Sequence, residues 1–125
     1  MDEELPEKLE DFKKRMRRRL GCNCYNKEGK PISLMEYADL FEDPSYQVIK
    51  KDFIGPYEIS TVWLGINHNI RGEPKKIFET MVFTENEEDE FYRYQERYAT
   101  LQEAELGHEI IAKIIEAKVN ARNIE

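Results

Sequence analysis

The sequence predicts an α+β fold: an antiparallel β-meander of about four strands packed with a C-terminal helix, a short internal helix and an N-terminal amphipathic helix. Its 125 residues suit one domain rather than two. Strand-like segments in the middle are joined by loops too short for a parallel crossover, which favours antiparallel neighbours. Two Ser/Thr-x-x-Glu capping boxes mark helix starts. We therefore assign an N-terminal charged amphipathic helix to residues 1–21, a single α+β domain to residues 22–120 and a frayed tail to residues 121–125.

The N-terminal helix is predicted over residues 2–20, and Gly21 ends it. Its apolar residues recur at helical spacing on one narrow stripe, formed by Leu5, Leu9, Phe12, Met16 and Leu20. So narrow a stripe on so charged a helix gives little stability alone. The helix is therefore expected to pack on the domain or on a second copy of itself.

A small hairpin is expected over residues 24–32, around a turn that contains Gly29. Ser33 then begins the short internal helix, because Ser33 and Glu36 form a capping box. Pro44 ends that helix, since the residue before a proline disfavours helical geometry.

Four strand-like segments follow, at residues 46–54, 57–66, 76–84 and 91–98. Gly55 and Pro56 join the first two. The second segment is almost free of charge, so a central strand covered on both faces is expected. An acidic, exposed turn at residues 85–90 precedes the fourth.

The C-terminal helix begins at the second capping box, which Thr100 and Glu103 form, and is expected to fade near Asn120. Its inward face is predicted to contain Leu101, Ala104, His108, Ile111, Ile115 and Lys118, widened by Ile110, Ile114 and Ala117. His108 lies on this apolar face, so a packed histidine bonded to a strand residue is expected there.

The charge balance argues against a general nucleic-acid binder, because the net charge is −7 and phosphate neutralisation requires a basic surface. The local basic cluster at residues 13–19 is interpreted as a solvated helix face. No apolar run is long enough to span a membrane, and the acidic N-terminus does not resemble a secretory signal.

The two cysteines, Cys22 and Cys24, cannot build a disulfide framework, so a reducing cytoplasmic location is expected. These cysteines, His68 and His108 lack the ligand spacings of structural zinc sites. No nucleophile elbow, phosphate loop or dinucleotide fingerprint is present. We expect no metal and no cofactor.

Glu79 interrupts an otherwise apolar strand and marks a candidate ligand-binding site. A buried carboxylate needs a partner, so Glu79 either binds a ligand or pairs with Arg93 or Arg97 on the next strand. His68 follows Asn67 at the end of the central strand, where polar groups indicate either a contact site or turn chemistry. The predicted ligand-binding set is His68, Glu79, Arg93, Tyr94, Tyr98 and Asn67. Trp63 and Phe78 are assigned to the core.

Residues 24–110 contain an ordered series of blocks, of which Ile59–His68 and Ile77–Phe83 are the clearest, followed by Tyr98–Thr100 and Glu103–His108. Together they resemble an uncharacterised family of small proteins from tailed phages and prophages. The loop 69–74 contains less glycine than that family usually has. The resemblance implies a phage setting and a shared fold, but no reaction.

These observations lead us to expect a non-enzymatic phage or prophage accessory protein that acts by binding in the host-cell cytoplasm, and that counters host defence. Its partner would be a nucleotide signal or a host protein; the basic N-terminal helix or the acidic turn would contact a protein. One alternative is an oligomeric assembly protein that associates through its N-terminal stripe. Another is a small hydrolase that uses Glu79 and His68.

Overall fold

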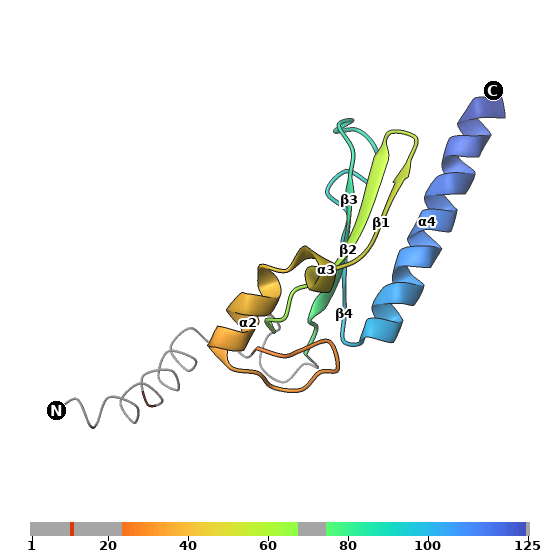
Figure 1. Ribbon diagram of the computed structural model, residues 1–125. Helices are drawn as coiled ribbons and strands as arrows, with labels where there is room; N and C mark the ends of the chain where they lie inside the picture. Colours follow the sequence, from red (N-terminus) through yellow and green to blue (C-terminus); the bar gives the residue numbers. More distant parts are fainter. Residues whose placement is uncertain (1–10, 12–23, 68–74, 125) are drawn as a thin grey trace.

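The computed structural model describes Asp11, residues 24–67 and residues 75–124 (Figure 1). Apart from Asp11, the N-terminal helix expected over residues 2–20 lies outside the described residues, and so does its apolar stripe. The same holds for Cys22 and His68.

The described part of the chain forms a four-stranded antiparallel meander with helices, as the sequence predicts. The strands pair in the order β1-β2-β3-β4, each with its neighbour in the chain. They are β1 (Val48–Ile54), β2 (Tyr57–Trp63), β3 (Phe78–Phe83) and β4 (Gln95–Tyr98). The helices are α2 (Leu34–Phe41), α3 (Pro44–Gln47) and α4 (Leu101–Ile124).

Side-chain caps start the two short helices. The Ser33 hydroxyl accepts a hydrogen bond from the Glu36 amide at 3.1 Å, which confirms Ser33 as the predicted N-cap of α2. The Asp43 carboxylate accepts from the Ser45 amide at 3.0 Å and begins α3, whose first residue is Pro44. This additional helical turn delays the start of β1 to Val48.

The expected hairpin around Gly29 is present as a short antiparallel bridge between Tyr25 and Pro31. Gly29 has φ 82°, a left-handed conformation that glycine adopts at little cost. The Asn26 side chain accepts hydrogen bonds from the amides of Glu28 and Lys30, which closes the turn.

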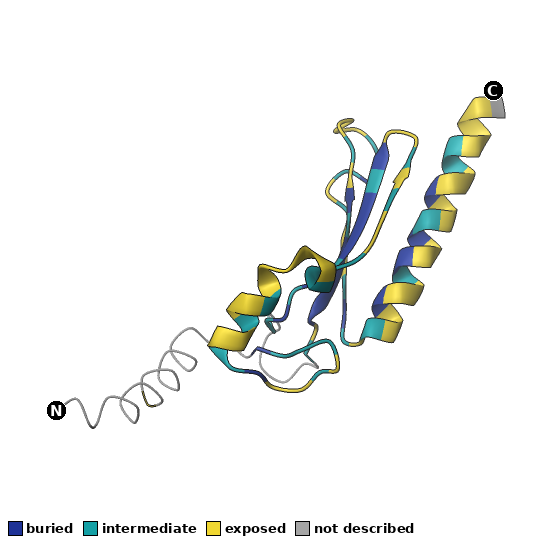
Figure 2. Cartoon of the chain, in the orientation of Figure 1, coloured by how far each residue is buried: buried dark blue, intermediate teal, exposed yellow. Residues whose placement is uncertain are grey.

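Helix α4 packs along one face of the sheet (Figure 1). The Thr100 hydroxyl accepts a hydrogen bond from the Glu103 amide at 3.1 Å, at the predicted start. The helix continues to Ile124, beyond the expected end at Asn120. Figure 2 shows that its inward side is buried and its outward side exposed, so Ile110 and Ile114 do not widen the buried face as expected.

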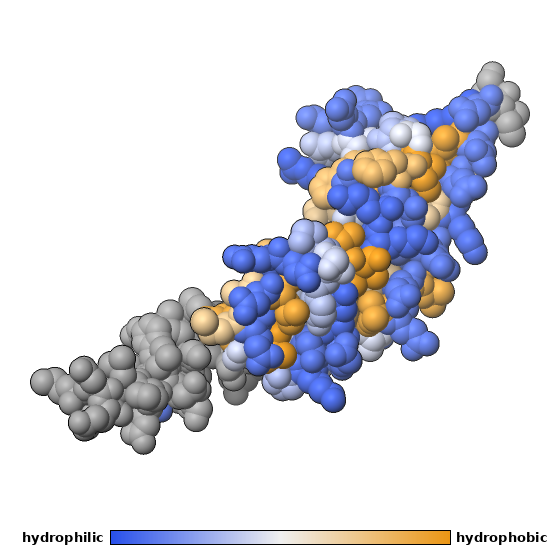
Figure 3. All heavy atoms as spheres, viewed as in Figure 1, coloured by the Kyte–Doolittle hydropathy of each residue, from blue (hydrophilic) through white to orange (hydrophobic). Residues whose placement is uncertain are grey.

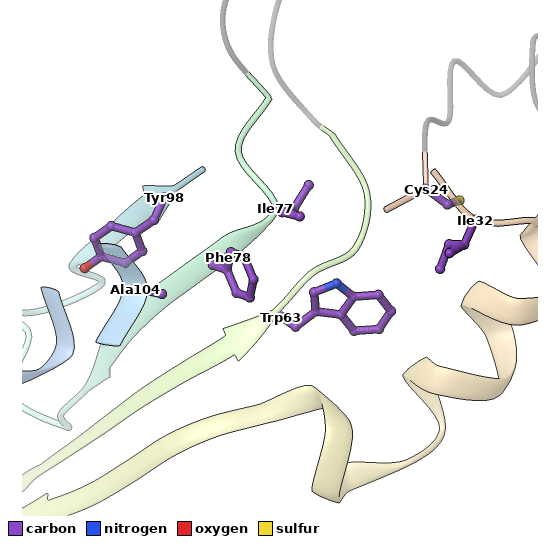
Figure 4. Close-up of a cluster of buried hydrophobic side chains, with 7 residues drawn as sticks. All are labelled: Cys24, Ile32, Trp63, Ile77, Phe78, Tyr98 and Ala104. Atoms are coloured by element: carbon purple, nitrogen blue, oxygen red, sulfur yellow. The ribbon is translucent and has the colours of Figure 1, made fainter. Parts of the chain in front are cut away.

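Within the described residues, the core consists of two clusters. One surrounds Trp63 and Phe78, both fully buried as predicted, and is shown in Figure 4. The Trp63 indole donates to the backbone carbonyl of Tyr25 at 2.9 Å, which ties the N-terminal hairpin to the sheet. The second cluster lies at the other end of α4 and contains Tyr57, Ile59, Val82, Phe91, Ile111 and Ile115.

The expected cover on both faces of the central strand is present in part. On β2, the residues that face α4 are buried, whereas on the other side Ser60 is buried and Glu58 and Val62 are half-buried. The strand also ends at Trp63, so the predicted continuation to Ile66 is wrong except for an isolated bridge to Cys24.

The last strand is shorter than predicted. Residues 91–93 form a turn, and strand β4 covers only Gln95–Tyr98, preceded by a hydrogen bond from the Val82 amide to the Tyr94 carbonyl. The Asp89 carboxylate accepts a hydrogen bond from the Phe91 amide, and Arg93 adopts φ 60°. Because the Phe91 side chain inserts into the core beside Tyr57, this segment cannot keep the alternation of a strand.

Candidate functional site

Glu79 is buried on the partly covered face of the sheet, and its partner is Arg97. The two residues are cross-strand neighbours, and the Arg97 Nε atom donates to Glu79 Oε2 at 2.9 Å. This is one of the two structural pairings that the sequence allowed. The pair satisfies the desolvated carboxylate, so Glu79 needs no ligand for its own stability.

Tyr98 lies on the opposite face, against α4. It is paired with Phe78, and its ring approaches Gly107, where a Cβ atom would overlap the ring and hydroxyl. Burial raises the pKa of the Tyr98 hydroxyl above its ordinary value. Thr80 lies close to it, but the hydroxyl has no hydrogen bond of good geometry among the described residues.

The remaining members of the predicted set are dispersed. The Arg93 guanidinium is exposed and lies 5.3 Å from the centre of the Tyr92 ring. The Tyr94 ring packs against Phe91, and burial raises the pKa of its hydroxyl. Asn67 is half-buried beyond the end of β2, and His68 lies outside the described residues. The sheet therefore separates Glu79 from the tyrosines, and the ligand-binding role of this set stays a prediction.

A buried polar chain crosses the sheet beneath α4. His108 is fully buried; its Nε2 atom lies 2.7 Å from Asp52 Oδ2, and its Nδ1 atom lies 2.7 Å from Thr61 Oγ1. The Thr61 and Thr80 hydroxyl oxygens are 2.5 Å apart. When the neutral ring carries its proton on Nε2, every donor finds an acceptor, from Thr80 through Thr61 and His108 to the Asp52 carboxylate. His108 is thus bonded to strand partners, as predicted.

These residues resemble a hydroxyl–imidazole–carboxylate triad in composition, but the hydroxyl is inaccessible. Thr61 and Thr80 are fully buried between α4 and the sheet. A nucleophile must reach its substrate, so this arrangement serves packing and orientation rather than covalent chemistry. Only Asp52 reaches the surface, with more than a third of its side chain exposed.

A second polar cluster fixes the acidic turn to the end of α4. The Asp89 side chain is 2% exposed and accepts hydrogen bonds from the Tyr57 hydroxyl, the Phe91 amide and Lys118 Nζ, the last at 3.1 Å. Burial alone would raise the pKa of the Asp89 carboxyl, but these donors outweigh it and lower the pKa to about 2. Hydrogen bonds to Tyr57, Glu90 and Asp89 likewise outweigh burial and raise the pKa of Lys118.

A groove of about 710 Å³ lies at the end of the sheet where β1 connects to β2, and we call it the turn-end groove. It lies between the β1–β2 turn, the acidic turn and the last turns of α4. It is lined by residues 53 and 55–58, residues 83–86, Asp89 and Arg122. In the view of Figure 3, hydrophobic residues reach the surface in several places between hydrophilic residues.

An aromatic pair flanks one acidic residue in this groove. The register places Phe53 opposite Glu58, and Glu58 opposite Phe83, in one row across three strands. Phe53 is 71% exposed and Phe83 47%, although both are large apolar side chains. Since neighbouring strands are about 4.8 Å apart, the two phenylalanines are about 10 Å apart at the backbone, with the Glu58 carboxylate between them.

The electrostatics of the groove are acidic. Glu58 and Glu85 line it and form no ion pair with another described residue. Arg122, in contrast, is paired with Asp89, and its Nη2 atom lies 3.5 Å from Asp89 Oδ2. Exposed Glu87, Glu88 and Glu90 follow directly in the acidic turn. The groove therefore presents aromatic faces and negative charge together, which suits a cation.

Sequence reasoning missed Phe53 and Glu58, although a signal was present. Gly55 and Pro56 were identified as the connection between two antiparallel strands. A tight connection there pairs residue 54 with 57 and residue 53 with 58, as the structure shows. Phe53 was thus predictable as the neighbour of Glu58, but its exposure was not.

Among the described residues, no group of histidine, cysteine, aspartate and glutamate side chains is arranged to hold a metal ion. None of the described helices combines the length and apolar character that crossing a membrane requires. No family model, no curated protein and no solved structure matches the chain.

Proposed function

We propose that this chain is a non-enzymatic binding protein and that it takes a basic segment of another protein in the turn-end groove. The observation that carries the proposal is the row Phe53–Glu58–Phe83, which exposes two aromatic rings on either side of a carboxylate. In the phage setting that the resemblance implies, the partner is a host protein.

The spacing of the row suits a lysine or arginine side chain. A cation held above Glu58 lies about 5 Å, measured along the row, from the strand that carries each phenylalanine, so either ring can come within the range of about 6 Å over which cation–π attraction is significant. The Glu58 carboxylate then neutralises it from below. Each ring contributes about 0.5–1 kcal/mol at an exposed site, and an exposed ion pair contributes less than about 1 kcal/mol.

These magnitudes make one basic side chain a weak ligand, so a segment with several basic residues is needed for useful affinity. The acidic turn supplies further contacts, because its exposed glutamates continue from the rim of the groove. The net charge of −7 also accelerates encounters with basic partners.

A nucleotide signal is less favoured in this groove. Its phosphates would face Glu58, Glu85 and the glutamates of the acidic turn, and the one lining arginine already contacts Asp89. A hydrolase based on Glu79 is also less favoured, because the Glu79 carboxylate is bonded to Arg97. The assembly alternative through the N-terminal stripe falls outside the described residues.

The test is a fluorescence-anisotropy titration of the full chain against a labelled glycine–serine peptide that carries several arginines. A peptide with glutamates in the same places and a labelled cyclic dinucleotide serve as comparators. We expect binding of the arginine peptide only, with an affinity that falls as salt is added. Binding of the dinucleotide alone would overturn the proposal.

Two matched pairs of variants locate the site. Phe53→Ala is compared with Phe41→Ala, which removes another exposed aromatic ring, on α2. Glu58→Gln is compared with Glu105→Gln, which removes the same charge from an exposed position of α4 outside the lining of the groove. We expect Phe53→Ala and Glu58→Gln each to weaken binding about two- to fivefold, equivalent to about 0.5–1 kcal/mol. Equal effects within each pair would show only general electrostatic or apolar attraction, against the proposal.

A further inference from the structure

Helix α4 has a second apolar row on its outward side. Leu106, Ile110 and Ile114 follow one another at intervals of four residues, and each is about half exposed. The buried row, which includes Ala104, His108, Ile111 and Ile115, is centred roughly 130° away around the helix. Figure 2 shows that the side of α4 turned away from the sheet is exposed.

The fold itself does not account for this outward row. Among the described residues, α4 packs against the four strands, and these contact its inward side. Single exposed apolar residues are common, but three large ones in line on one helix form a continuous strip, which is typical of an interaction surface.

We propose that the outward row of α4 binds the same row of a second copy of this chain, with the two helices antiparallel. A two-fold axis level with residue 111 places each large side chain between two of the partner's. Leu106 then lies between the partner's Ile114 and the partner's Ala117, and Ile110 lies between the partner's Ile110 and the partner's Ile114. The result is a symmetric dimer in which two helices are sandwiched between two sheets.

Charge complementarity selects this partner and this orientation. Glu109 and Lys113 are both exposed and lie along one side of the row. The same two-fold axis sets Glu109 of one copy level with the partner's Lys113. It also sets Lys113 level with the partner's Glu109, so two contacts between opposite charges form. A parallel pair related by a two-fold axis would instead place these residues of the two copies on opposite sides of the seam, so neither opposite-charge contact would form.

The oligomeric state of the full chain provides the first test. Sedimentation equilibrium at about 100 μM is expected to give a dimer. Ile110→Glu is expected to raise the dimer dissociation constant at least tenfold, because it places a charge in the desolvated centre of the interface. Phe41→Glu is the matched control, since it puts the same charge at an exposed apolar position on α2, and it is expected to stay dimeric. Circular dichroism shows whether both variants keep the helix content of the unaltered chain.

A charge exchange provides the second test. Glu109→Lys alone and Lys113→Glu alone each set like charges against each other at both contacts, so each is expected to weaken the dimer severalfold. The double exchange, Glu109→Lys with Lys113→Glu, is expected to restore it. A purely intrahelical role for the pair would change helix stability but not the dissociation constant.

The orientation is tested by disulfide crosslinking under mild oxidation. A mixture of the Leu106→Cys and Ala117→Cys variants is expected to form a disulfide-linked dimer. Neither variant alone is expected to form it. The unaltered chain, which keeps its own cysteines, measures the background of crosslinking. Crosslinking of Leu106→Cys with itself would indicate parallel helices and overturn the proposed geometry. A monomeric full chain, or an Ile110→Glu variant that dimerises normally, would overturn the proposal as a whole.

Discussion

The Nε2 atom of fully buried His108 in α4 lies 2.7 Å from Oδ2 of Asp52, a residue of edge strand β1 that is partly open to solvent. Through Thr61 and Thr80 the same imidazole reaches β2 and β3. One side chain therefore connects the C-terminal helix to three strands. This polar chain positions α4, and α4 in turn forms one wall of the turn-end groove at Arg122.

Replacement of His108 by leucine is expected to lower the free energy of unfolding by about 2 kcal/mol. Leucine fills most of the volume but leaves the buried Thr61 hydroxyl without its acceptor, and an unsatisfied buried polar group costs about 1–3 kcal/mol. Urea unfolding followed by tryptophan fluorescence measures the change. Glu105→Gln, at an exposed position of the same helix, is the control and is expected to change stability by less than about 0.5 kcal/mol. Equal stability of the two variants would contradict the role assigned to His108.

The pKa of Asp89 makes stability depend on acid pH. Its pKa in the folded state is lowered from 3.8 to about 2, so the folded state holds the proton less tightly than the unfolded state does. The resulting stabilisation is fully present above about pH 4 and is lost as the pH falls through 4 towards 2. It amounts to at most about 2 kcal/mol.

Asp89→Asn is the control for this pH dependence. Urea unfolding at a series of pH values between neutrality and pH 2 is expected to show a shallower acid decline in the variant than in the unaltered chain. The variant is also less stable at neutral pH, because Lys118 loses a buried anionic partner. An unchanged acid decline would show that other carboxylates are responsible.

Tyr98→Phe is expected to leave the protein equally stable or to stabilise it by up to about 1 kcal/mol. The Tyr98 hydroxyl is buried without a hydrogen bond of good geometry, so its removal gives up little and relieves its desolvation. Differential scanning calorimetry gives the shift in melting temperature. A marked loss of stability would mean that the hydroxyl has a hydrogen-bond partner within the folded protein.

Gly107→Ala is expected to destabilise the protein despite the better helix propensity of alanine. The gain in propensity is about 1 kcal/mol, but the added Cβ atom would overlap the Tyr98 ring and hydroxyl, and overpacking costs about 1–3 kcal/mol. Tyr98→Phe should relieve part of this cost when the two changes are combined. Calorimetry of the two single variants and the double variant measures the coupling, and additive effects would show that the two residues do not interact.

The fold was predictable wherever local patterns decide it. The capping residues Ser33 and Thr100 start helices where expected, and the near absence of charge in β2 identifies it as a central strand. Tertiary contacts overrode local pattern at Phe91, whose aromatic neighbours indicate a strand. Its amide is held by Asp89 and its ring by Tyr57, so the segment turns instead.

The sites were less predictable, because they combine residues far apart in the chain. The partner of Glu79 was among the two proposed, since Arg97 lies on the neighbouring strand. The link from His108 to Asp52 depends on α4 lying across β1, which no local pattern indicates. The placement of Phe53 and Phe83 on either side of Glu58 likewise depends on the register of three strands at once.

Chemical-shift mapping by NMR tests the central claim most directly. The full chain, labelled with ¹⁵N, is titrated with the arginine peptide, and the shifts of its backbone amides are followed. If the turn-end groove is the binding site, the largest changes occur at Phe53, Glu58 and Phe83 and in the acidic turn. Largest changes around Asn67, Glu79 and Arg93, with residues 53–58 unaffected, would contradict it.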